Sequence, residues 1–232
     1  MKTLKRSIFN RSSHSGDGFK AQRRELIESW LNKYDIRNYT INDDFTIDVS
    51  GDVYLDLKDL TELPEYIQFG IVKGDFDCRR GNLTSLRGCP REVGKGFYCT
   101  LNELTSLEGA PEEVGGAFCC SLNKLTSLKG APKKVGGNFD CSNNQLISLE
   151  GAPKEVHGYF DCNYNQLTSL EGVPEKIGTG FWCIHNNLTS LVGAPEKVGR
   201  NFYCSHNSIQ FTEDDVRKAC NVEEKICIIS YI

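Results

Sequence analysis

Cysteine and histidine are the residues of this chain whose spacing could support chemistry. The 232 residues include 11 cysteines and 4 histidines. Seven of the cysteines follow one another at intervals of 21 residues: Cys78, Cys99, Cys120, Cys141, Cys162, Cys183 and Cys204. Such a series could ligate metal, form disulfides or pack in a core. Structural zinc sites use closely spaced cysteine pairs, and no second cysteine column accompanies this one, so core packing is favoured. Cys119 falls outside the series, and we expect it to point outward and to react first.

The histidines offer weaker evidence for chemistry. His185 and His206 occupy one column of the 21-residue spacing, so they should lie about one strand spacing apart. Two adjacent imidazoles could bind a metal or sense pH. However, Tyr164 and Asn143 continue the column and add no strong ligand, so a polar patch is favoured. We find no catalytic triad pattern and no phosphate-binding loop. The sequence therefore predicts no enzyme, no metal site and no cofactor.

The cysteine spacing is part of a longer repeat, and this repeat determines where the remaining side chains of each coil lie. The unit reads F-x-C-x-x-N-x-L-x-S-L-x-G-x-P-x-x-V/I-G-x-x and continues without insertion between residues 76 and 207. A fixed period of this length indicates a solenoid. F-x-C alternates as a strand with one buried face requires. We expect the glycine after V/I, such as Gly115 or Gly136, to adopt a positive φ. The repeated asparagines should form a buried ladder that bonds the backbone of adjacent coils: Asn102, Asn123, Asn144, Asn165, Asn186 and Asn207.

The unit resembles a leucine-rich repeat. Phe139, Cys141, Asn144 and Leu146 fill the second half of the family core L-x-x-L-x-L-x-x-N-x-L. The short unit, with L-T-S-L and G-A-P, is similar to the leucine-rich repeats of bacteria and tailed phages. The resemblance implies a mostly β repeat solenoid with a parallel sheet on a concave binding face and few or no helices on the convex face. With so many unpaired thiols, it also implies the cytoplasm of a bacterium or of an infected host cell.

The remaining segments divide the chain around a solenoid of about seven to eight coils, which we place at 53–211. Residues 1–19 read as a flexible basic arm, 20–52 as an N-terminal cap of helix plus strand, and 212–232 as a C-terminal cap of helix plus strand. Open solenoid ends need such caps.

Each cap has its own local signals. Residues 21–34 predict an amphipathic helix, and its apolar face is expected to carry Leu26, Trp30, Leu31 and Tyr34. A strand should follow, with Phe45, Ile47 and Val49 on one side. Near the other end Thr212 and Asp215 predict a helix N-terminus with a weak capping box. The final residues, including Ile226, Ile228 and Ser230, predict a strand that closes the last edge.

Charge and hydropathy restrict the partners. The formal net charge is −4, which argues against general nucleic-acid affinity. No apolar stretch is long enough for a membrane-spanning helix. We therefore expect neither a nucleic acid nor a membrane as partner.

The outward columns around the F-x-C strand vary from coil to coil and form the candidate site. Tyrosine and tryptophan dominate binding hot spots, and three aspartates on the same face favour a partner with a basic patch. The residues expected to contact a partner on the concave face are Asp77, Tyr98, Asn138, Asp140, Tyr159, Asp161, Trp182, Ile184, His185, Asn201 and Tyr203.

These features favour a non-enzymatic protein-binding module, which the resemblance links to a phage or bacterial protein that modulates a cellular protein. One alternative is a structural or virion-associated component addressed by its N-terminal arm. Another is a small-molecule-binding or metal-binding enzyme with its site at a cap, near Trp30 or near His185 and His206.

Overall fold

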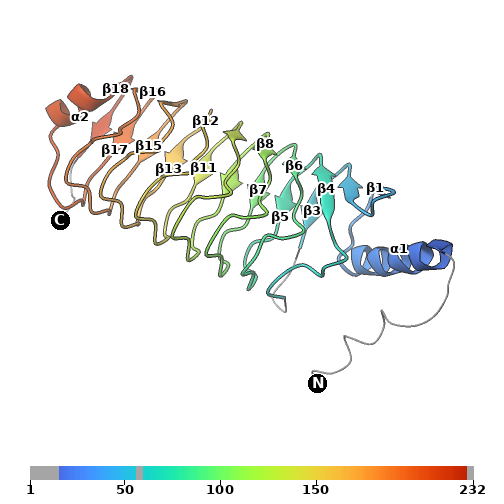
Figure 1. Cartoon of the computed structure of the whole chain (residues 1–232). Coiled ribbons are helices and arrows are strands. Elements are labelled where there is room, and N and C mark those ends of the chain that lie inside the picture. The colour runs from blue at the N-terminus through green and yellow to red at the C-terminus, as the bar shows by residue number, and fades with distance from the viewer. Residues whose placement is uncertain (1–15, 56–59, 229–232) are drawn as a thin grey trace.

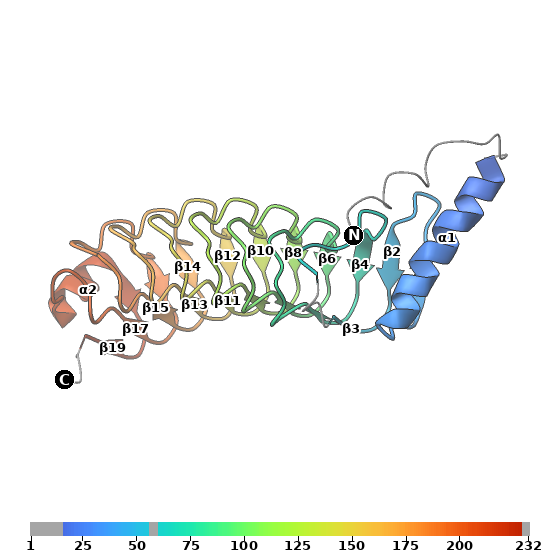
Figure 2. The ribbon, with the colours of Figure 1, turned by 90° about the horizontal axis from the view of Figure 1, so that it is seen from below.

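The chain folds into a parallel β-solenoid of about eight turns (Figure 1). The computed structural model describes residues 16–55 and 60–228. Each coil of the repeat contributes two short strands, one from F-x and one from E/K-V, which lie on different sides of the core (Figure 2). The coils therefore stack into two sheets that run the length of the molecule. Helices α1 and α2 lie at opposite ends (Figure 1).

The nine-stranded sheet is built from the F-x segments. It is wholly parallel and in register, so that Phe139 lies opposite Phe118 and Phe160. Its strands, from one end of the sheet to the other, are β3 (Val53–Tyr54), β5 (Phe76–Asp77), β7 (Phe97–Tyr98), β9 (Phe118–Cys119), β11 (Phe139–Asp140), β13 (Phe160–Asp161), β15 (Phe181–Trp182), β17 (Phe202–Tyr203) and β19 (Ile226–Cys227). The first coil is two residues longer than the repeat unit, because Val53 pairs with Phe76, 23 residues later.

A ten-stranded sheet, which the sequence did not indicate, lies on the other side of the core. It is parallel except that β1 pairs antiparallel with β2. Its strands in order are β1 (Tyr39–Ile41), β2 (Ile47–Val49), β4 (Phe69–Val72), β6 (Glu92–Val93), β8 (Glu113–Val114), β10 (Lys134–Val135), β12 (Glu155–Val156), β14 (Lys176–Ile177), β16 (Lys197–Val198) and β18 (Asn221–Val222). Most of these strands have only two residues, too few for an alternating pattern to be recognised.

The core is a set of continuous side-chain files. The phenylalanine rings of the repeat are all fully buried, and successive rings from Phe76 to Phe160 stack with centroids 5.0–5.5 Å apart. The seven cysteines of the periodic series are also buried and free, which confirms core packing. The thiol of Cys141 donates to the Asp161 carbonyl at 3.3 Å, and five other cysteines of the series make the same contact to the next coil. Cysteine thus supplies both apolar bulk and a weak donor.

The asparagine ladder joins each coil to the one before it. Asn144 donates from Nδ2 to the Cys120 carbonyl at 3.2 Å, and its Oδ1 accepts from the Leu125 N–H at 3.0 Å. The other five asparagines of the column bond the equivalent groups of their preceding coils. These bonds satisfy buried backbone groups in turns that the sheets do not reach.

The glycines of the repeat have two different roles, and one expectation about them is wrong. The column with positive φ is the glycine of G-A-P, represented by Gly151 at 89°. The glycine after V/I does not adopt a positive φ. Instead, a Cβ on Gly115 would lie 2.2 Å from the Gly94 carbonyl oxygen, so this column lets adjacent coils approach closely. His157 stands in the same column, and its N–H bond to the preceding coil lengthens to 3.3 Å.

The N-terminal cap differs in detail from its prediction. Helix α1 spans Gly16–Lys33, so residues 16–19 belong to the helix rather than to the predicted arm. Ile27 and Leu31 are fully buried and Trp30 is nearly so, whereas Leu26 is 44% exposed and was wrongly placed on the apolar face. Phe45 has a φ of 68° and lies between β1 and β2, so it is not part of the predicted strand. The rest of the predicted arm, residues 1–15, lies outside the described residues.

The C-terminal cap follows its prediction closely. Helix α2 spans Glu213–Ala219 and begins with the expected capping box between Thr212 and Asp215. Strand β19 continues the nine-stranded sheet by pairing with β17 within the chain. Ser230 and the other residues predicted to extend this strand to residue 232 lie outside the described residues. No helix of the described segments is long and apolar enough to cross a membrane.

Candidate functional site

The register of the nine-stranded sheet places six of the predicted site residues in one file on its outward side, which we call the nine-stranded face, and the other five in the columns beside this file. The middle residue of each F-x-C segment points away from the buried phenylalanine and cysteine. Because adjacent strands pair in register at a spacing of about 4.8 Å, these middle residues lie side by side along the solenoid. Asp161, for example, lies directly opposite Asp140 on one side and Trp182 on the other. Within the repeat the central file is Asp77, Tyr98, Cys119, Asp140, Asp161, Trp182 and Tyr203, and it is extended by Tyr54 at one end and Cys227 at the other.

Three aromatic side chains gather at the C-terminal half of this face. Tyr159 and Trp182 are in contact, with ring centroids 4.4 Å apart and planes tilted by 43°. Tyr203 lies beside Trp182 with centroids 6.1 Å apart. All three are only partly buried. They form an amphipathic surface of the type enriched in protein interfaces.

Two carboxylates border the aromatic group. Asp140 accepts hydrogen bonds from the N–H and the hydroxyl of Ser142, and Asp161 accepts from the N–H of Asn163. Burial, and to a smaller extent the neighbouring Asp140, raises the pKa of Asp161 to about 7 against the hydrogen bond from Asn163. Burial raises the pKa of Tyr159 to about 12, with further contributions from Cys119 and Asp140. Among the described residues, neither aspartate forms an ion pair.

The N-terminal half of the face holds a third aspartate whose charge is balanced. Asp77 binds the guanidinium of Arg79 through both carboxylate oxygens, with contacts of 2.6–3.0 Å. The same guanidinium lies over the ring of Tyr98, 5.0 Å from its centroid. Asp77 raises the pKa of Arg79 through this hydrogen bond. The sequence prediction included Asp77 and Tyr98 but missed Arg79, although its position two residues after Asp77 places it on the same face.

The remaining predicted residues have backbone contacts or lie at the border of the face. Asn138 accepts the N–H of Tyr159 at 3.0 Å through Oδ1, which joins two coils. The N–H of Ile184 donates to Asn163 Oδ1 at 2.6 Å. Ile184 and Asn201 are partly buried beside the aromatic group.

A column of residues in the left-handed region runs along the border of the face. It contains Arg80, Leu101, Leu122, Asn143, Tyr164, His185 and His206, with φ between 53° and 60°. Tyr164, His185 and His206 form a ring stack, with centroids 4.4 Å and 4.2 Å apart. Partial burial and the adjacent His206 lower the pKa of His185. The sequence placed the two histidines in one column but did not indicate the stack with Tyr164 or the backbone conformation, which leucine and tyrosine rarely adopt.

The thiol of Cys119 is less acidic than its outward position suggested. It is half-buried among the central file, and burial together with Asp140 raises its pKa to about 12. Because the thiolate is the reactive form, the expectation that this thiol reacts first is not supported.

Other parts of the described chain do not bring functional groups together in this way. No cluster of three or more histidine, cysteine or acidic side chains in residues 16–55 and 60–228 is arranged to hold a metal ion. Trp30 is buried in the cap, where it packs against Tyr34 and Phe69. A shallow hollow beside α2 includes Asp215, whose carboxylate is engaged by Thr212 in the helix cap.

Comparison of the chain with protein-family models, curated proteins and solved structures finds no match. The geometry of the face is therefore the basis for its interpretation.

Proposed function

We propose that this protein is a non-enzymatic binding module that engages a partner protein through the nine-stranded face. The observation that carries the proposal is the row of Tyr159, Trp182 and Tyr203, held side by side and partly exposed on a rigid in-register sheet. Rigid aromatic side chains lose little entropy when they are covered, and they supply much of the energy of protein interfaces.

The repeat supports a finer version of the proposal. Its similarity to the leucine-rich repeats of bacteria and tailed phages favours a protein that binds and modulates a cellular protein in the cytoplasm of a bacterium or an infected host cell. The eleven free cysteines suit a reducing compartment. The aspartates of the face favour a partner with a basic patch.

Substitution of Trp182 and Tyr203 by alanine tests the proposal. We expect the double variant to capture the partner at least about a hundredfold less well than the unchanged protein, because hot-spot truncations cost 2 kcal/mol or more each. Capture would be measured by quantitative mass spectrometry of proteins retained from an extract of the producing cells. Circular dichroism would verify that the variant is folded.

The control is a double alanine variant of Glu175 and Lys176, which removes two exposed side chains from the ten-stranded side of the same molecule without changing net charge. It should retain full capture. Undiminished capture by the Trp182 and Tyr203 variant, or equal loss in both variants, would contradict the assignment of the face.

A further inference from the structure

The nine-stranded face contains the same kind of pair at two places, an aspartate directly opposite an aromatic ring. Asp77 lies opposite Tyr98 in the register of β5 and β7. Asp161 lies opposite Trp182 in the register of β13 and β15, four coils further along. Among the described strands of this sheet, no other adjacent pair has a carboxylate followed by an aromatic ring; Tyr54 also lies opposite Asp77, but in the reverse order. The two pairs can therefore be compared position by position.

At the first pair, a cation from the chain itself completes the arrangement. Arg79, two residues after Asp77, binds both carboxylate oxygens and covers the ring of Tyr98. A guanidinium suits this position because it forms a bidentate contact with a carboxylate and stacks on an aromatic face at the same time. The chain thus shows which chemical group this surface geometry accommodates.

At the second pair, the corresponding position holds a neutral residue. Asn163 stands two residues after Asp161, and its Oδ1 accepts the N–H of Ile184 at 2.6 Å. The backbone N–H of Asn163 donates to Asp161, but its neutral side chain brings no positive charge to the carboxylate. Asp140, directly opposite Asp161 on the other side, adds a second carboxylate. Tyr159 packs on Trp182 and enlarges the aromatic surface beside them.

We propose that Asp161, Trp182 and Tyr159, with Asp140 beside them, form a receptor for one arginine side chain of the partner. The partner's guanidinium would take the place that Arg79 takes beside Asp77 and Tyr98. A neutral or acidic group would leave the carboxylates without a counter-charge on a surface that is already half-buried, which is unfavourable. The inference rests on the proposed function, since it specifies the chemistry of the partner at that same face.

The test uses the full chain and a small probe. N-acetyl-arginine N-methylamide would be titrated while the indole N–H signal of Trp182 is followed by NMR. The chain has two tryptophans, so Trp182→Phe assigns the signal. The citrulline derivative has nearly the same shape without the charge, and the lysine derivative tests for an ammonium. We expect the arginine probe to bind at least about tenfold more tightly than the citrulline probe.

Matched variants separate this site from general electrostatics. Asp161→Asn should weaken arginine binding at least about tenfold, whereas Asp77→Asn, the same charge change in the same file, should leave it within about twofold. Asn163→Arg should abolish binding, because it supplies the guanidinium from within the chain. Arg79→Asn should create a second arginine site, reported by the ring signals of Tyr98.

The possible outcomes separate a failure of the arginine receptor from a failure of the proposed function. Equal binding of arginine and citrulline probes, no response to arginine, or full binding by Asn163→Arg would overturn the inference. If the Trp182 and Tyr203 double variant loses partner capture while the unchanged protein ignores arginine, the proposed function stands and only the arginine receptor is wrong. If arginine binds as expected but capture is independent of Trp182 and Tyr203, the site exists and the proposed function fails.

Discussion

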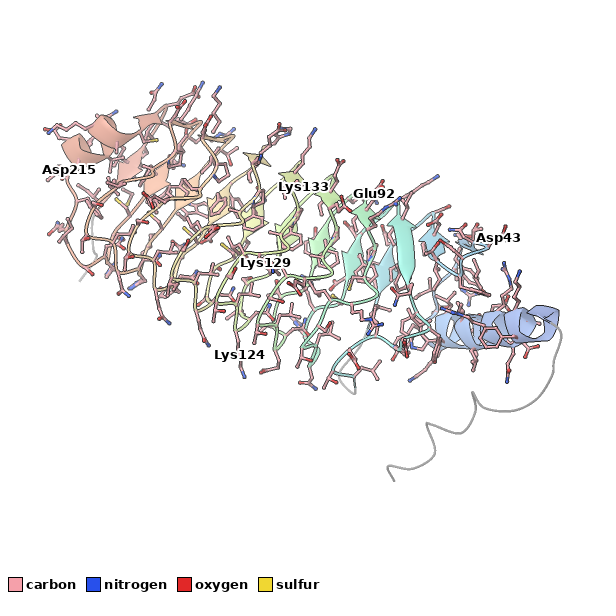
Figure 3. The ribbon with its side chains drawn as sticks, in the orientation of Figure 1. Asp43, Glu92, Lys124, Lys129, Lys133 and Asp215 are labelled. Carbon is pink, nitrogen blue, oxygen red and sulfur yellow. The ribbon has the colours of Figure 1, made fainter. Side chains whose placement is uncertain are left out.

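The two sheets of the solenoid carry very different side chains on their outward sides, although both are built from the same repeat. On the ten-stranded side, the first residues of six successive strands are three glutamates and three lysines: Glu92, Glu113, Lys134, Glu155, Lys176 and Lys197. Glu92 and Lys133, which come from different coils, lie along this side of the molecule (Figure 3). Ion pairs such as Lys133–Glu112 at 3.6 Å and Lys197–Glu223 at 2.6 Å balance the charges between coils. The nine-stranded face carries aromatic rings and two aspartates without ion pairs among the described residues.

This difference indicates what each surface is suited to do. A surface that mixes charges of both signs, with several of them paired, is well solvated and discourages association. A surface with clustered rings and uncompensated carboxylates is neither required for folding nor optimal for solubility. Because both surfaces are built on the same 21-residue unit, the contrast comes from the outward residues and not from the scaffold.

The inward sides of the two sheets also differ, and substitutions there should change the free energy of unfolding the most. Phe139, on the nine-stranded sheet, stacks between two other rings. Val135 is the buried residue of β10 in the ten-stranded sheet. Phe139→Ala should lower the free energy of unfolding by about 3–5 kcal/mol, and Val135→Ala by about 1–3 kcal/mol. Urea denaturation followed by circular dichroism measures both. Equal losses would show that the aromatic file is not the main support of the core.

The outward sides should differ in how their carboxylates affect the free energy of unfolding at different pH values, by about 1 kcal/mol. The pKa of Asp161 is raised in the folded chain to about 7 from 3.8, so the folded state holds the proton more tightly than the unfolded state. The stability due to this protonation is fully present below pH 3.8 and is lost as the pH rises through 7. Asp161→Asn should therefore be more stable than the unchanged protein at pH 8 by on the order of 1 kcal/mol, since the side chain remains partly solvated.

The pH test has a matched variant on the other side. Glu155 contacts Lys134 and His157 at 4.0 Å and 3.8 Å, and all three side chains are exposed. Glu155→Gln should change the free energy of unfolding by no more than about 0.5 kcal/mol at pH 8. A gain in stability for Glu155→Gln as large as that for Asp161→Asn would remove the electrostatic distinction between the two surfaces.

The smallest effect is expected for the charge pairs of the ten-stranded side. Lys133→Ala breaks the exposed contact with Glu112 and should cost less than about 0.5 kcal/mol in low salt. In about 1 M salt the difference should disappear, because such pairs are screened. Thermal unfolding at the two salt concentrations provides the measurement. A loss above about 1 kcal/mol that persists in salt would mean that this surface contributes to stability as well as to solubility.

The repeat itself allowed much of the architecture to be predicted. A strict period fixes the register, because equivalent residues of stacked coils must pair, and so the files of Phe139 and Cys141 could be assigned from the sequence alone. The capping box at Thr212 is equally local, since it depends on two side chains three residues apart. The same logic placed Asp161 and Trp182 side by side on the candidate face.

Other features depended on contacts between coils and were decided only by the tertiary structure. Asp77 and Asp161 occupy identical positions in the repeat, yet one is neutralised by Arg79 and the other is half-buried with a raised pKa. The periodic pattern treats them as equivalent, because charge balance depends on which variable side chains surround each carboxylate. Likewise, the close approach of Gly115 to Gly94 is a distance between adjacent coils. The sequence alone determined which residues align, and the packing of the coils determined what each aligned residue encounters.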